Sequence, residues 1–192
     1  WSAGPAPQEE DAMSNLSMRF RFNSEKAVDV ICFIASKAPV NDIYHICKVL
    51  YFADKLHMER YGRSICGDTY IAMKFGPVPS GTYDLIKDVR SHRTHSNNYD
   101  HAAASFQLIG EDRIKVIRDV NEDLFSDSDI ECLNQSIQEH GSKPFDVLVK
   151  ETHDEVWQSA DENGEIAIES IVATLSDSDA LLEYLKESHY TI

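Results

Sequence analysis

The sequence has no apolar run approaching the ~18 residues that a transmembrane helix requires, and its polar, acidic start is unlike a secretory signal. It also lacks the loops G-x-x-x-x-G-K-[ST] and G-x-G-x-x-G that bind nucleotides, and the G-x-S-x-G turn of serine hydrolases. No stripe of aromatic and basic side chains is present for binding nucleic acid. We therefore expect a soluble, cytoplasmic protein that is not an enzyme, uses no cofactor, and binds neither a membrane nor, by this chain alone, nucleic acid.

Paired cysteines are also missing. The four cysteines are widely spaced, with no C-x-x-C among them, so we expect reduced thiols in a cytosolic protein. A zinc site made of Cys47, Cys66 and nearby histidines is a weaker alternative, because the spacing differs from that of the common sites. A metal site in the loop that contains His92, His95 and His101 is equally open, although solvated histidines are favoured there.

Basic residues are scarce in the C-terminal part of the chain. Residues 119–192 contain 3 Lys and Arg against 19 Asp and Glu, whereas residues 1–118 contain 15 against 14. The net charge of −15 thus comes from the C-terminal region, which would repel phosphates and anionic lipids and attract a basic protein. A surface that only aids solubility is the alternative. The acids taken as candidates for facing a partner are Glu122, Asp123, Glu162 and Glu165.

Hydrophobic periodicity predicts a helical hairpin near the start of the chain. Apolar residues recur at helical spacing over 24–37 and 43–61, with Asn23 or Ser24 and Asn41 or Asp42 as N-caps and Gly62 as the C-terminal stop. The remaining patterns predict, in chain order, a strand at 69–75 ended by Gly76-Pro77, a helix up to Val89, a polar loop at 91–104, a β-hairpin at 105–117, a helix from Ser126 to Gly141, a short helix at 144–150, a turn around Trp157, and helices at 168–175 and 177–188.

These elements predict a mainly helical single α+β domain with a small antiparallel β element formed by 69–75 and the 105–117 hairpin. Residues 1–17 lack hydrophobic periodicity and are rich in Pro, Ala and Glu. We expect them to be a disordered leader or an expression remnant, with Met13 or Met18 as the native start. The domain is accordingly assigned to residues 18–192.

Several short blocks occur in an order that resembles a known family. They read Leu50-Tyr51-Phe52-Ala53-Asp54, Tyr61-Gly62, Cys66-Gly67-Asp68-Thr69-Tyr70, Phe75-Gly76-Pro77-Val78 and Tyr83-Asp84-Leu85. A second group follows, with Ser128-Asp129 leading a helix that ends at Gly141, then Leu148, Thr152-His153 and Trp157. Together they resemble the SocA-like Panacea antitoxin domain over about residues 24–160.

The resemblance implies a protein that neutralises a partner toxin by binding it directly, in a toxin–antitoxin system. Two alternatives come with it: an adaptor that delivers its partner to an AAA+ protease, and a phage or mobile-element protein of unknown activity. The residues that match the family pattern, in structural or partner-binding roles, are Tyr51, Asp54, Gly62, Gly67, Asp68, Tyr70, Gly76, Pro77, Val78, Tyr83, His153 and Trp157.

Tyr51 and Asp54 lie three residues apart on one helix face, so both can point at the Gly67-Asp68 turn. We expect Asp54 to accept hydrogen bonds from the amides of that turn, with Tyr51 packed beneath them. Asp54 and Asp68 acting as a general acid and base is the alternative, and it would require opposed pKa shifts. We expect His153 to be buried and bonded to the backbone or to an acidic neighbour.

Overall fold

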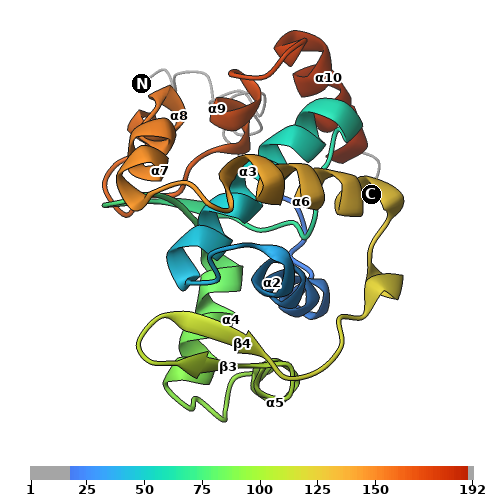
Figure 1. Cartoon of the computed structure of the whole chain (residues 1–192). Coiled ribbons are helices and arrows are strands. Elements are labelled where there is room, and N and C mark those ends of the chain that lie inside the picture. The colour runs from blue at the N-terminus through green and yellow to red at the C-terminus, as the bar shows by residue number, and fades with distance from the viewer. Residues whose placement is uncertain (1–17, 190–192) are drawn as a thin grey trace, which may run out of the picture.

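Two helices in immediate succession form the centre of the molecule. α2 (Ser24–Lys37) is buried at every position from Ala27 to Ala35, and α3 (Ile43–Tyr61) lies against it (Figure 1). The computed structural model describes residues 18–189. Asn23 caps α2 and Asp42 caps α3 by accepting a backbone N–H bond in the first turn. The predicted helical hairpin is therefore confirmed, with Asp42 as the second cap.

Two further helices, α4 (Ser80–Arg90) and α6 (Asp127–His140), cover this pair. α4 contacts α2, and α6 lies along α3. Ser126 and Asp129 form a reciprocal capping box at the start of α6. The remaining helical elements are α5 (Tyr99–Ala103), η1 (Glu122–Leu124), α7 (Phe145–Thr152), α8 (Glu155–Gln158), α9 (Ile168–Val172) and α10 (Ser178–His189). The segment predicted as a polar loop at 91–104 thus contains a short helix.

The β structure consists of two separate antiparallel hairpins. β1 (Tyr70–Met73) pairs with β2 (Gly76–Pro79), and β3 (Phe106–Ile109) pairs with β4 (Arg113–Val116). The prediction that Gly76-Pro77 ends the β structure is wrong, because these residues begin a second strand. The two β regions also form no common sheet. The segment GPVP was not predicted to be a strand, because proline lacks the N–H that a strand residue normally donates.

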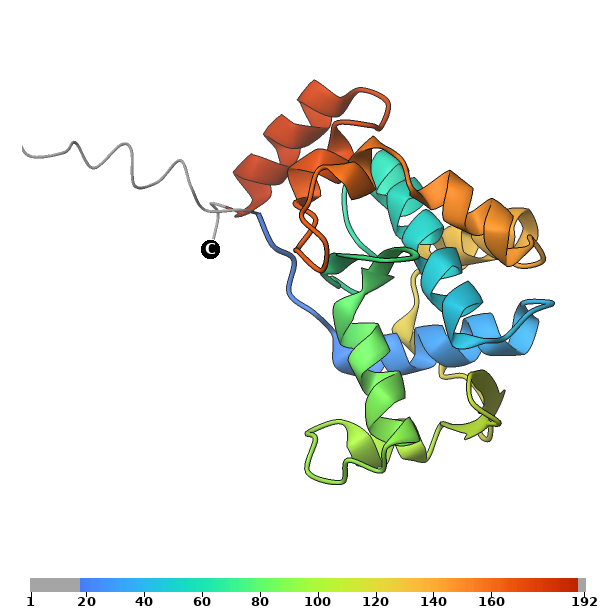
Figure 2. The same ribbon diagram turned by 90° about the vertical axis from the view of Figure 1, so that its left-hand side faces the viewer.

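Two apolar clusters form the core of residues 18–189. The larger one joins α2, α3, α4 and α6, and the smaller one packs α9 and α10 onto the far end of α3 around Tyr51, Tyr70 and Val156 (Figure 2). The mainly helical α+β single domain expected from the sequence is confirmed over this range. The leader expected at 1–17 lies outside the described residues.

Candidate functional site

Asp54 ties the loop after α3 back onto the helix. Its Oδ1 accepts hydrogen bonds from the Ile65 N–H at 2.7 Å and the Ser64 hydroxyl at 3.0 Å, and its Oδ2 accepts one from the Tyr70 hydroxyl at 2.7 Å. The side chain is 1% exposed. Burial raises the pKa of this carboxyl to about 6, outweighing the three hydrogen bonds that favour the charged form. The amide that Asp54 accepts belongs to Ile65 and not to the expected Gly67-Asp68 turn.

Asp68 caps α4 from a distance. Its carboxylate accepts the N–H groups of Thr69 and Gly81 on Oδ1, and the N–H and hydroxyl of Thr82 on Oδ2, all at 2.7–2.8 Å. α4 begins after Pro79, which offers no side-chain cap of its own. The Asp68 carboxylate takes the place of that N-cap, because it lies near the positive N-terminal end of the α4 dipole and accepts the first amides of the helix. Burial raises the pKa of Asp68 above its usual range.

Glycines allow two close approaches around these aspartates. Gly67 has φ +73°, and a Cβ there would lie 2.2 Å from the Arg21 carbonyl oxygen. Gly62 ends α3 with φ +66°, and a Cβ there would lie 2.7 Å from the Tyr184 ring. The family-type glycines therefore let the segment before α2, and helix α10, pack directly on the loop.

Tyr51 supports Tyr70 from within the smaller core cluster. The two rings meet edge to face with centroids 5.2 Å apart. Tyr51 is fully buried, and its hydroxyl has no hydrogen-bond partner among residues 18–189. It thus packs under the residue that donates to Asp54.

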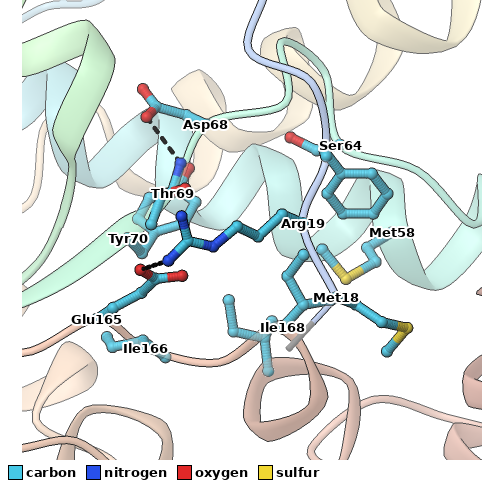
Figure 3. Close-up of a pocket in the computed structure, with 12 residues that line it drawn as sticks. Met18, Arg19, Met58, Ser64, Asp68, Thr69, Tyr70, Glu165, Ile166 and Ile168 are labelled. Atoms are coloured by element: carbon cyan, nitrogen blue, oxygen red, sulfur yellow. Dashed lines mark hydrogen bonds and ion pairs between the residues drawn. The ribbon is translucent and has the colours of Figure 1, made fainter. Parts of the chain in front are cut away.

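The cavity next to Asp68 is too small for a substrate. It has a volume of about 10 Å³, room for one water molecule. Figure 3 shows Met18, Met58 and Ile168 gathered along it, with Arg19 reaching Glu165 across the strand residue Tyr70. The side chains around Asp68 therefore pack segments of the structure together and leave no space for a ligand.

Strand β1 is paired on both sides. Ala72 pairs with Pro77 across the hairpin, but its N–H donates to the Gly164 carbonyl and its carbonyl accepts from the Asn163 N–H. The Ala72–Pro77 pair therefore exchanges no backbone hydrogen bond, and Pro77 turns its carbonyl to the outer edge of β2. Proline is tolerated there because it has no N–H to leave unpaired.

Lys48 from α3 donates a hydrogen bond to the Pro77 carbonyl on the outer edge of β2. Its Nζ donates to the Pro77 oxygen at 2.6 Å and lies 5.0 Å from the centre of the Tyr44 ring. The lysine is fully buried, and no carboxylate lies within 4 Å of its Nζ among residues 18–189. Burial lowers its pKa to about 8. Lys48 was not among the residues predicted from the sequence, although a lysine between the apolar helix positions Ile46, Cys47 and Leu50 was a usable signal.

The second block of family residues fixes the turn between β1 and β2. The Trp157 indole donates to the Met73 carbonyl at 2.8 Å, and His153 Nε2 bonds to the Lys74 carbonyl at 3.1 Å. The His153 and Trp157 rings lie 4.0 Å apart. His153 is half-buried and bonded to the backbone. A Cβ on Gly76, whose φ is +99°, would lie 2.4 Å from the Thr152 hydroxyl. The α7–α8 corner thus clamps the hairpin.

A groove runs beside this clamped hairpin. It has a volume of about 410 Å³ and lies between the start of α3, the β1–β2 hairpin and α4. Val78 and Tyr83 of the family pattern line it, together with Lys48 and Lys74. Unlike the cavity beside Asp68, which has room for one water molecule only, this groove is large enough to receive a side chain of a partner.

The four candidate acids are all exposed but occupy two places. Glu122 and Asp123 are in η1, which contacts α2, whereas Glu162 and Glu165 lie in the segment beside β1. Glu165 pairs with Arg19 at 2.5 Å. The acids therefore do not form one patch.

The thiols and histidines form no metal centre within residues 18–189, where no three His, Cys, Asp or Glu side chains gather suitably. All four cysteines are free and buried, and burial raises the pKa of Cys47 to about 12. His92 and His95 are exposed. In the same part of the chain, no helix has the length and apolarity to cross a bilayer.

Fold and site together define a small, mainly helical domain. The side chains of the family pattern hold the β1–β2 hairpin in place, and some of them border the groove beside it. A family model described as the antitoxin SocA-like Panacea domain matches residues 46–158, more than half of the chain. This protein belongs to that family. No curated protein and no solved structure matches the chain.

Proposed function

We propose that this protein is an antitoxin that neutralises a partner toxin by direct, non-covalent binding. The observation that carries the proposal is the family match over 46–158, which spans the hairpin, its clamp and α6. The protein would act in the cytoplasm, where its four free thiols stay reduced.

The bonding of the motif residues supports binding over catalysis. Asp54 accepts three hydrogen bonds and Asp68 accepts four, all from groups that hold loops and helix ends in place. A general acid or base needs a reacting group within hydrogen-bond reach. The motif therefore serves best as a rigid frame for a binding surface.

The charge distribution supports a basic partner. The four candidate acids lie in two separate places, so we expect the negative charge of residues 119–192 to act through its long-range field more than through one contact. Such a field mainly raises the rate of association.

The toxin assay comes first. Each gene that flanks the coding sequence is expressed alone and with this protein, and growth is followed. We expect one product to arrest growth and this protein to restore it and to form a stable complex with that product. Absence of toxicity, or toxicity that this protein leaves unchanged, would overturn the proposal. The toxin's half-life in the same cells separates blocking from delivery to an AAA+ protease, which predicts a shorter half-life.

The electrostatic part is tested by association rates at several salt concentrations. Neutralising Glu122, Asp123, Glu162 and Glu165 should slow association and flatten its salt dependence. The matched control neutralises four exposed acids of residues 1–118: Glu25, Asp84, Asp100 and Glu111. Equal effects of the two sets would refute a special role for the C-terminal acids.

A further inference from the structure

Three aromatic rings from different segments meet beside the groove: Tyr44 and Phe75 line it, and Phe145 contacts both rings. Tyr44 comes from the start of α3, Phe75 from the β1–β2 turn and Phe145 from the start of α7. The Tyr44 and Phe145 centroids are 4.4 Å apart, and those of Phe75 and Phe145 are 5.3 Å apart. Phe75 and Phe145 are each 46% exposed. We call these three residues the aromatic patch.

The patch stands on a rigid base. The Tyr44 hydroxyl donates to the Phe75 carbonyl at 3.3 Å, and the turn beneath is fixed by Trp157 and His153. Exposed aromatic side chains that are fixed before binding lose little conformational entropy in a complex. Such residues are the commonest energetic anchors of protein interfaces.

The groove is cationic although the protein is acidic. Lys48, Lys74 and Arg90 line it, against the single carboxylate of Asp112. Within residues 18–189, none of these three cations has a carboxylate within 4 Å. Lys74 and Arg90 are exposed, whereas Lys48 is fully buried in the side of the groove and contributes its charge without contacting solvent. The chain's net charge of −15 would repel a polyanion such as nucleic acid, so a lone carboxylate on a partner fits the charges better.

We propose that the groove and the aromatic patch seat a segment of the partner protein in which an acidic side chain is flanked by apolar ones. The apolar side chains cover Tyr44, Phe75 and Phe145, and the carboxylate lies between Lys74 and Arg90. This inference rests on the proposed function for the identity of the partner, the toxin. It also locates the partner's binding site, called the seat below, at the groove and the aromatic patch, whereas the family match locates no binding site.

A peptide selection tests the seat without the toxin. Random twelve-residue peptides displayed on phage are selected on the full chain. The selected sequences should combine Asp or Glu with Leu, Phe or Trp. Their affinity should fall about 10- to 30-fold with Phe75→Ser or Lys74→Glu. Exchanging the peptide's acid for Lys should restore binding to Lys74→Glu.

Matched controls come from the same chain. Ile117→Ser removes an apolar residue that is 47% exposed and lies outside the groove. Lys186→Glu makes the same charge change on α10. Both should bind the peptides as the wild type does, and all variants should share its melting temperature within about 2 °C, as expected for exposed positions.

The outcomes separate the two proposals. Selection of basic peptides, of no peptides, or of peptides insensitive to Phe75 and Lys74 would overturn the seat. The same variants are then tested against the flanking toxin. Neutralisation that survives Phe75→Ser and Lys74→Glu refutes the seat and leaves the antitoxin assignment standing. Peptide binding at the groove without any neutralised toxin refutes the antitoxin assignment instead.

Discussion

Replacing Lys48 with methionine should change how the stability of this protein depends on alkaline pH. Lys48 is fully buried, and its Nζ donates to the Pro77 carbonyl without a carboxylate nearby. Burial lowers its pKa from 10.5 to about 8. The folded state therefore carries a desolvated charge at neutral pH, at a cost of about 3 kcal/mol for a shift of this size.

The sign of the effect follows from proton binding. Below pH ~8 the lysine is charged in both the folded and unfolded states, so the full cost is present. Between about pH 8 and 10.5 the folded state releases its proton first, and the wild type becomes more stable as pH rises. Methionine has no proton to release. From about pH 7 to 9.5 the wild type should thus gain about 2 kcal/mol relative to Lys48→Met.

Urea unfolding at several pH values, followed by circular dichroism, measures this difference. Subtracting the variant's free energy from the wild type's removes the titration of groups that the two share. Lys74→Met serves as the reference for losing one lysine from the surface of the same groove. A difference between wild type and Lys48→Met that stays constant over this pH range would refute the reasoning, because it would mean that Lys48 is solvated or compensated.

Substitutions at three further positions test the frame of the site by thermal or urea unfolding. Gly76→Ala should cost at least ~1 kcal/mol more than Gly110→Ala, because both glycines have positive φ but only the new Cβ at Gly76 meets other atoms; equal losses would contradict this. The bulkier Gly76→Val should lose well over ~1 kcal/mol, and an unchanged melting temperature would refute the assigned conformation. Leu50→Ala should cost about 2–5 kcal/mol, since Leu50 is fully buried in the cluster with α2; unchanged hydrogen exchange in α2 and α3 would speak against it. Asp68→Ala should cost about 2–4 kcal/mol, because two α4 amides lose their acceptor, and protection of those amides equal to the wild type's would show that another acceptor serves.

Helix positions were predictable because their signals are local. The caps Asn23, Asp42 and Ser126 bond to amides three residues away, and Gly62 ends α3 through its own φ. The β3–β4 hairpin followed in the same way from a turn between two short apolar runs. The strand β2 was missed because Pro77 and Pro79 are acceptable only at the non-hydrogen-bonded positions of an edge strand, and it is the register against β1 that places them there.

The sequence by itself thus determined the longer helices and their caps, which depend on residues within a turn or two of one another, and the uneven charge, which depends on composition. The family followed from the order of short blocks along the chain, whereas the short helix α5 was not predicted. Only the tertiary structure decided what surrounds the hairpin. Lys48 reaches Pro77 across 29 positions, and His153 and Trp157 reach the turn across 79 and 84. Hydrogen bonds of this span form only after the apolar core has placed α3 and the α7–α8 corner on either side of the hairpin, and no local pattern encodes that placement.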